Sequence, residues 1–230
     1  MLVPGLGEHY VMPRLRLLLA LSLSLIVAPA LADAMPVLPR EPMALARLVV
    51  MEVLVGLLLG FVARLALTAI HAGGSLIAMQ SGLSAASMFD PSETGQGTVP
   101  GSFLAAAALT LMFAAGFHHL LLRAVAASYA TFPIGGAIDL AAASDLLLRL
   151  SADALATGAR IAAPMILAGL VVNLGLGAIG RMVPSFPIFL VALPAQLLLA
   201  LLVLELSLPA GMELFGRAFV DGLGWLDRAG

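Results

Sequence analysis

Five long runs of apolar residues dominate the chain, and polar or proline-rich segments separate them. The runs cover residues 15–32, 44–70, 102–127, 154–179 and 188–208, and Gly116-Phe117-His118-His119 interrupts the third run. None of them alternates apolar and polar positions as a membrane β-strand would, and most reach the roughly 20 residues with which a helix spans a bilayer. The pattern therefore predicts membrane-type helices.

Breaks in the apolar pattern mark where these helices are expected to end. A proline-rich loop covers 33–43, a polar loop covers 92–98, turn signals lie at 132–136 and 180–187, and short amphipathic stretches are expected at 141–149 and 213–225. The runs 154–179 and 188–208 have similar lengths on either side of a tight polar turn. They are expected to form a helical hairpin.

The first apolar run has two interpretations. Arg14 precedes a short apolar core, and the run closes with Ala28-Pro29-Ala30, as in a secretory signal that is removed at an A-x-A site. The alternative is a first membrane helix that breaks near Pro29. The residues of this run leave both interpretations open.

The segment 74–91 differs from its apolar neighbours. It is rich in Gly, Ala and Ser, nearly uncharged, and ends in Phe89-Asp90-Pro91. A segment of this kind is a poor lipid-facing helix, and within membrane-type sequence it usually lines a cavity or packs against protein. It is the first candidate for a functional region.

The composition supports a membrane protein and excludes several functions. Of the 230 residues, 62% are hydrophobic and 10% are charged, whereas an ordinary soluble domain has about 25% charged residues. The expected fold class is an all-α integral membrane protein. The absence of cysteine excludes thiol catalysis and Cys-based metal sites, and the net charge of −2 argues against nucleic acid as a partner.

Glu52 and Arg64 are charged residues inside the second run. Charges within a membrane segment are costly and usually face protein or water. These two are too far apart for an i,i+4 ion pair. Because the next embedded carboxylate, Glu205, lies far along the chain, pairing with another helix or subunit is favoured over a proton or ion relay.

Small and polar residues recur with helical spacing in the fourth run. Gly169, Asn173 and Gly177 fall on one helix face, at positions i, i+4 and i+8. This spacing is typical of close contacts between membrane helices. Helix packing is therefore the predicted role of Asn173 and Gly177.

The sequence shows no residue set that is typical of an enzyme. His118 and His119 are adjacent, without a carboxylate one helical turn away, so a place at a helix end or in a loop is favoured over a metal site. There is no Ser-His-Asp set, no phosphate-binding glycine loop and no paired carboxylate site. We expect no catalytic residues, no metal and no cofactor.

Several motifs together resemble one family of membrane proteins. The stretch 80–91, QSGLSAASMFDP, is similar to the Q-x-G-L-S-x-A-x-x-x-D-P motif of the FliR/SctT family of flagellar and virulence-type export proteins. The family's L-P-I-G, N-L-x-L-G, R-x-x-P-Q-x-x-I-F and F-P motifs are similar to residues 132–135, 172–177, 181–189 and 193–194. Order and spacing hold over most of the chain. Ser75 and Ser185 depart from the family, which usually has an acidic residue and Gln there.

The resemblance implies a subunit of the type III protein export gate for flagellar assembly, in the bacterial inner membrane at the flagellar basal body. Family members resemble a fusion of two partner folds, so residues about 1–140 are expected to be FliP-like and about 141–230 to form a FliQ-like hairpin. FliP-like and FliQ-like subunits in a hetero-oligomeric ring, a FlhB-like protein, exported unfolded proteins and membrane lipid are the implied partners. The resemblance also favours retention of the helix 15–32.

A channel plug is the main site that the resemblance implies. The residues of the expected plug loop are Gly82, Ser84, Ser87, Met88, Phe89, Asp90 and Pro91. Met88 and Phe89 supply deformable apolar bulk for a seal, and Asp90-Pro91 stops the helix. The alternative is that Met88 and Phe89 pack against a neighbouring helix.

Further residues are expected in contacts between helices or subunits. They are Glu52, Arg64, Asn173, Gly177, Arg181, Pro184 and Pro194. Kinks at Pro164, Pro187 and Pro194 would suit hairpins that bend along a ring. Because polar groups inside the membrane need partner subunits, we expect the isolated chain to be unstable.

Two other functions are possible from the sequence. An SctT-type subunit of a virulence secretion system shares these motifs, but the stretch 80–91 is closer to the flagellar branch. A small-solute secondary transporter would require inverted repeats and paired broken helices around a midplane charge cluster. The sequence shows one discontinuous region and no repeat.

Overall fold

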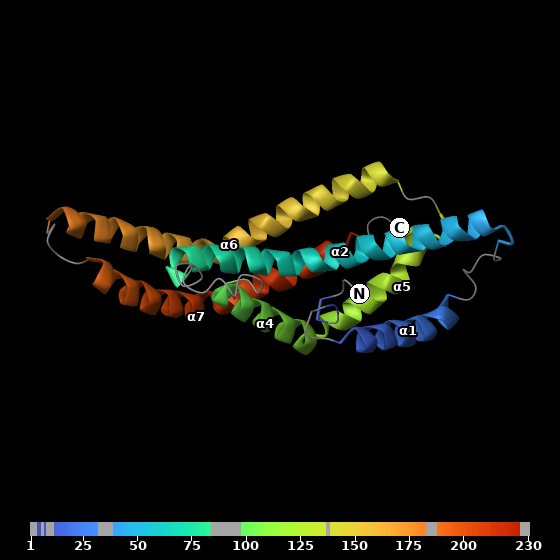
Figure 1. Ribbon diagram of the computed structural model, residues 1–230, viewed down its shortest axis with the longest axis horizontal. Coiled ribbons are helices and arrows are strands. Elements are labelled where there is room, and N and C mark those ends of the chain that lie inside the picture. The colour runs from blue at the N-terminus through green and yellow to red at the C-terminus, as the bar shows by residue number, and fades with distance from the viewer. Residues whose placement is uncertain are drawn as a thin grey trace. The chain divides into compact units, whose positions relative to one another are not determined.

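The protein is described by a computed structural model, which contains helices and connecting turns (Figure 1). It describes residues 4–5, 7, 12–31, 39–83, 98–136, 139–182 and 188–225, of which residues 30 and 188–191 are described by their backbone alone. The helices are α1 (Pro13–Ala30), α2 (Pro42–Gln80), α4 (Val99–Ala114), α5 (Phe117–Thr131), α6 (Leu140–Met182) and α7 (Ile188–Leu223). No strand occurs in the described ranges, and the predicted all-α fold is confirmed.

Among the residues that the structure describes, three helices are long and apolar enough to cross a membrane. They are α2, α6 and the part Ala192–Leu223 of α7. Helices α4 and α5 together form a fourth candidate, which is bent by 71° at the break between them. Gly116 lies at this break with a φ of 73°, a backbone conformation that glycine adopts at little cost. The predicted interruption near residues 116–119 and the membrane-protein prediction are thus confirmed.

Helices α2, α6 and α7 are longer than the hydrophobic runs predicted. α2 continues through Gln80 and does not end near Ile70, α6 includes both 141–149 and 154–179, and α7 includes 188–208 and most of 213–225, up to Leu223. Residues 150–153 and 209–212 contain no turn dipeptide, so the helical hydrogen bonds continue through them. α2 continues through Gly73-Gly74, where it packs closely against α6 and α4. Pro164 and Pro194 lie inside α6 and α7. Pro187 lies outside the described residues, and the kinks stay a prediction.

Side-chain caps set the starts of two helices. The hydroxyl oxygen of Thr98 accepts the backbone N–H of Gly101 at 3.2 Å, at the start of α4. The carboxylate of Asp139 accepts the N–H groups of Ala141 and Ala142 at 2.9 and 3.2 Å, at the start of α6. Each cap satisfies backbone donors that have no partner within the helix.

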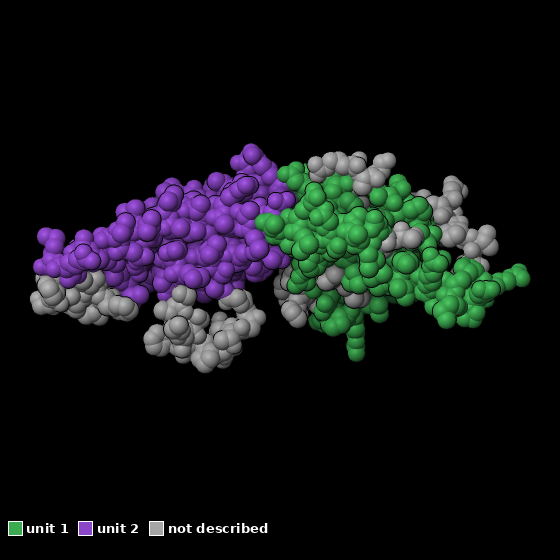
Figure 2. Space-filling model, turned by 90° about the horizontal axis from the view of Figure 1, so that it is seen from above, with its two compact units in different colours: residues 1–66, 112–152, 219–230 green, residues 67–111, 153–218 purple. Residues whose placement is uncertain are grey.

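The chain forms two compact units, which Figure 2 shows in separate colours. Unit 1 contains Met1–Ala66, Met112–Ala152 and Phe219–Gly230, and unit 2 contains Leu67–Leu111 and Asp153–Ala218. In unit 1 the rings of Phe117 and Phe219 stack with centroids 5.4 Å apart. The predicted division into FliP-like and FliQ-like parts near residue 140 concerns resemblance to partner folds and stays a prediction.

Glycines bring the helices of unit 2 into backbone contact. A β-carbon added to Gly74 of α2 would lie 2.2 Å from the Cα atom of Gly101 in α4. A β-carbon added to Gly158 of α6 would lie 2.7 Å from the carbonyl oxygen of Ala69 in α2. The described part of the small-residue segment, 74–83, therefore packs against protein, one of the two environments predicted for it.

Candidate functional site

The carboxyl end of α2 is a turn that contacts α7. Gly82 has a φ of 75°, which suits the glycine that commonly ends a helix. A β-carbon on Gly82 would lie 3.5 Å from Oε1 of Gln196 and 3.6 Å from Cδ2 of Leu193 in α7. Ser81 is fully buried, and its hydroxyl donates to the carbonyl oxygen of Ala78 at 3.1 Å. The point from which the chain leaves α2 is thus held by α7 and by its own last turn.

Three side-chain amides gather around this end of α2. The Nε2 atom of Gln196 in α7 donates to Oδ1 of Asn173 in α6 at 3.3 Å. The Oε1 atom of Gln80 lies 2.9 Å from the position of a β-carbon on Gly169 in α6. We call Gln80, Asn173 and Gln196 the amide cluster. It joins the end of α2 to both α6 and α7.

The contacts of α6 with α7 have the pattern of an antiparallel hairpin. Asn173 pairs with Gln196, and further from the connection a β-carbon on Gly211 would lie 3.5 Å from Cγ2 of Ile161. The residue that lies earlier in α6 is paired with the residue that lies later in α7, as in two antiparallel helices of a hairpin. Figure 1 shows the later part of α6 beside the earlier part of α7.

Most of the predicted plug loop lies outside the described residues. This holds for Ser84, Ser87, Met88, Phe89, Asp90 and Pro91, and also for Pro184. Gly82 is the member of the set that the structure places. The plug therefore stays a prediction.

Glu52 forms its contacts within the chain. Its carboxylate accepts the N–H of Gly135 at 3.4 Å and is hydrogen-bonded to the hydroxyl of Tyr129. Gly135 has a φ of 75° and lies in the turn after α5, the part that resembles the L-P-I-G motif. Sequence reasoning missed Tyr129, although it lies one helical turn before that motif. Glu52 thus fastens α2 to α5 and to the following turn.

We expect the Glu52→Leu variant to lose about 1–3 kcal/mol of stability, because the Gly135 N–H and the Tyr129 hydroxyl lose their acceptor in a half-buried place. Glu52→Gln keeps an acceptor oxygen and should cost less. The unfolding temperature of the chain, purified together with its expected partner subunits, measures both effects. Glu213→Leu is a suitable control, because the exposed Glu213–Arg217 pair should contribute at most about 1 kcal/mol. Equal losses for Glu52→Leu and Glu52→Gln would contradict this role.

The other predicted packing residues lie in varied surroundings. Arg64 is half-buried in α2, whereas Arg181 and Pro194 are exposed on α6 and α7. Gly177 would meet no atom within 4 Å if it carried a β-carbon, in contrast to Gly169 on the same predicted face. Within the described part of the chain these exposed positions are open to contacts with other molecules, and their roles stay predictions.

The two adjacent histidines lie in the first turn of α5, at a helix end as predicted. The rings of His118 and His119 have centroids 4.0 Å apart, and the ring of His118 lies 5.4 Å from that of Phe113. Among the residues that the structure describes, no three His, Asp or Glu side chains come together as metal ligands would. This geometry indicates packing at the break between α4 and α5.

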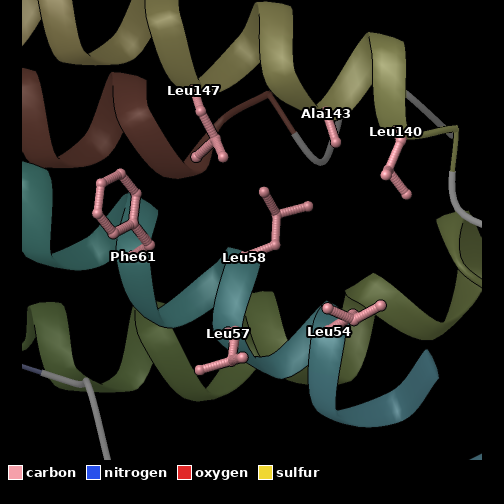
Figure 3. A pocket seen from close by; sticks show the side chains of 7 residues that line it. All are labelled: Leu54, Leu57, Leu58, Phe61, Leu140, Ala143 and Leu147. Carbon is pink, nitrogen blue, oxygen red and sulfur yellow. The ribbon is translucent and has the colours of Figure 1, made fainter. Parts of the chain in front are cut away.

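An apolar groove in unit 1 is a feature that sequence reasoning missed. It has a volume of about 320 Å³ and lies between α2 and α6 (Figure 3). The residues that line it are Leu54, Leu57, Leu58, Phe61, Leu140, Ala143 and Leu147. The α2 residues recur every three or four positions, which is the only trace of the groove in the sequence. The start of α6 could not be placed opposite them from sequence.

Burial differs strongly among the three candidate membrane helices. In α2, 56% of the most apolar stretch is buried within the protein. The corresponding share is 22% in α6 and 11% in α7. The hairpin of α6 and α7 therefore exposes many large apolar side chains. Large exposed apolar surfaces mark contact with membrane or with other protein.

Comparison with known proteins gives the family of this chain. Residues 1–222 match the family described as bacterial export proteins, family 1. The flagellar biosynthetic protein FliR of Caulobacter vibrioides is 38% identical over 228 residues, which cover 99% of this chain and 87% of that protein. FliR of Escherichia coli is 30% identical over 207 residues, covering 90% and 78% of the two chains. Yop proteins translocation protein T of Yersinia pestis is 30% identical over 185 residues, covering 80% and 70%. The chain therefore belongs to the bacterial export proteins, family 1, together with these flagellar biosynthetic and Yop translocation proteins.

Proposed function

We propose that this chain, a component of a flagellar or type III protein export apparatus, forms and plugs the export channel in the bacterial inner membrane. It does so as one subunit of a hetero-oligomeric ring with FliP-like and FliQ-like proteins, beside a FlhB-like protein. The role is non-enzymatic, and unfolded exported proteins are the cargo. The flagellar system is favoured over a virulence system because the aligned residues cover 87% and 78% of the two FliR proteins but 70% of the Yop translocation protein.

The apolar surface of α6 is the observation that carries this proposal. Exposed large apolar side chains extend along this helix from Leu148 to Met182, a path of about 51 Å at 1.5 Å per residue. The hydrocarbon core of a bilayer is about 30 Å thick, and a helix tilted by about 40° would still carry this surface through about 39 Å. The surface is thus longer than the hydrocarbon core is thick, which supports cover by further protein subunits.

Charges on the same helix support protein or water as part of its surroundings. Asp153 and Arg160 are exposed on α6 between Leu148 and Met182. Such charges are costly against lipid and are tolerated when they face protein or a water-filled cavity. A subunit that lines an aqueous channel and packs against neighbouring subunits offers both surroundings.

The plug proposal rests on the motif 80–91 together with the place where this motif begins. The amide cluster and Gly82 hold the end of α2 against α6 and α7, so the chain enters residues 84–91 from a defined position. A plug must close the channel by apolar contact and yet be displaceable, and Met88 and Phe89 have the side chains for this.

Co-purification tests the assembly. We expect that the chain, expressed with its FliP-like and FliQ-like neighbours and isolated by a tag, gives a discrete hetero-oligomer with one copy of this chain. Native mass spectrometry measures the composition. The chain expressed alone should fail to give a monodisperse particle, because the α6 and α7 surfaces lack cover. A stable monomer or homodimer, without the neighbours, would contradict the proposal and favour a transporter.

A further inference from the structure

The part of α2 that lies in unit 2 is open along one side. From residue 67 to 79 its buried positions are apolar or glycine, and they are Leu67, Ala69, Ile70, Gly73, Gly74, Ile77 and Ala78. The positions that are exposed or half-buried are Thr68, His71, Ala72, Ser75, Leu76 and Met79. The polar side chains of this part, on Thr68, His71 and Ser75, thus all lie on the open side. At about 100° per residue they fall within roughly 60° of one another, and we call these three residues the polar strip.

The polar strip points away from the helix that packs most closely behind it. A β-carbon on Gly73 would lie 2.9 Å from the carbonyl oxygen of Gly158 in α6. Gly73 is two residues from both His71 and Ser75, which is about 160° around the helix. α4 contacts α2 at the neighbouring Gly74, so α4 and α6 together cover the apolar side of this part of α2 (Figure 1).

Lipid is an unsuitable medium for the polar strip. α2 is a candidate membrane span, and polar or ionisable side chains within such spans face protein or a water-filled cavity. A span that packs its apolar side on protein and turns its polar side outward has the reverse of the arrangement that lipid favours. On α7 of the same unit, by contrast, the exposed side chains of Leu198, Leu202 and Leu206 are apolar. The strip therefore faces water or a further protein.

The hydrogen bonds of the strip suit water and a moving partner. The Nδ1–H group of His71 donates to the carbonyl oxygen of Leu67 at 2.8 Å, so Nε2 of the neutral ring is an acceptor. The hydroxyl of Ser75 donates to the carbonyl oxygen of Ala72 at 2.8 Å. Because these donors bond within α2, the strip offers acceptor atoms to water or to the N–H groups of a polypeptide. Passage through a channel requires contacts that are weak enough to be left again.

We propose that the polar strip lines the aqueous path of the export channel and contacts the exported polypeptide as it passes. The inference rests on the proposed channel function, which it deepens by naming a wall of the path, and it does not depend on the plug. The acceptor atoms of the strip take transient hydrogen bonds from backbone N–H groups. Since every unfolded polypeptide carries such groups, the contact does not depend on the sequence of the cargo.

Thiol labelling tests whether the strip faces water. The chain contains no cysteine, so Thr68→Cys, His71→Cys and Ser75→Cys each give it a single thiol. The probe is a trimethylammonium methanethiosulfonate, which does not cross membranes. It is added on both sides of liposomes that hold the complex with cysteine-free partner subunits, and the intact mass of the chain gives the labelling rate. We expect labelling about tenfold faster or more than at Leu206→Cys, the exposed apolar control on α7, because the reacting thiolate forms in water and is suppressed in apolar surroundings.

Labelling that is no faster in the strip than at Leu206→Cys would overturn the inference and indicate that a partner subunit covers the strip. The subunit composition of the same complex, measured by native mass spectrometry, separates this result from a failure of the proposed function. A complex that forms with its expected partners but protects the strip leaves the assembly intact and refutes the strip alone.

Disulfide crosslinking tests whether the strip contacts cargo. The probe is an exported flagellar protein of the same bacterium that carries one cysteine and is fused to a stably folded domain, which arrests it during export. With copper phenanthroline as the oxidant, we expect a disulfide between this cysteine and Thr68→Cys or His71→Cys, and none with Leu206→Cys. If the arrested cargo were present and no strip position formed a disulfide with it, the strip would lie outside the path and the inference would be overturned.

Discussion

Replacement of Gly74 by alanine is expected to prevent stable folding of unit 2 and thereby assembly of the chain into an export complex. The added β-carbon would lie 2.2 Å from Cα of Gly101, which is a backbone atom and cannot rotate away. Carbon atoms in contact need about 3.5–4.0 Å, so α2 and α4 would have to separate by about 1.5 Å. We expect a loss beyond the range of about 1–3 kcal/mol that is usual for overpacked sites.

Gly56→Ala is the matched control for this substitution. Gly56 lies on the same helix, and a β-carbon there meets nothing within 4 Å. This variant should be neutral or more stable by about 0.5–1 kcal/mol, because alanine has less conformational entropy to lose in a helix. The yield and unfolding temperature of the co-purified complex measure both variants. If Gly74→Ala and Gly56→Ala melted at the same temperature, the close contact of α2 with α4 would be refuted.

The second large effect concerns the proposed plug. We expect the double substitution Met88→Ala with Phe89→Ala to raise the ion conductance of the assembled complex by about tenfold or more, since losing about 1.4 kcal/mol of apolar contact shifts a closed–open equilibrium tenfold. The subunit composition should stay as in the wild type. Conductance in planar bilayers, with composition checked by native mass spectrometry, is the measurement.

A conservative pair of substitutions serves as the control for the plug. Met88→Leu with Phe89→Leu keeps apolar bulk at both positions and should leave the complex closed. Wild-type conductance in a fully assembled double-alanine variant would count against the plug. Loss of assembly in that variant would favour the alternative, in which Met88 and Phe89 pack against a neighbouring helix.

The fold class and the membrane character follow from the sequence because hydropathy is a local property. Long apolar runs with few charges can satisfy their backbone groups in lipid only as helices or closed barrels. Gly116 and the turn at 132–136 were readable as breaks for the same reason, since glycine and proline act on the backbone at their own positions. Local sequence patterns predict the helix ends less accurately. α2 extends through Gly73 and Gly74 because packing against α4 and α6 stabilises the helix where its own residues favour it weakly.

The candidate site was predicted only where its residues are neighbours in the sequence. The motif 80–91 and the face with Gly169 and Asn173 were visible from spacing, whereas the Asn173–Gln196 bond joins two helices. The sequence predicts a partner for Glu52 in another helix or subunit without naming it, and the structure gives Tyr129 and Gly135. Such pairs depend on how separate helices lie against each other, which no local pattern encodes.

The sequence by itself thus determined the all-α membrane class, the family motifs and the interruption between α4 and α5. Each of these depends on residue type and on spacing within one segment. Only the tertiary structure decided the backbone contact of Gly74 with Gly101, the hydrogen bonds of Glu52, the amide cluster and the groove beside Phe61. These features arise from distances between segments far apart in the chain, and packing sets those distances.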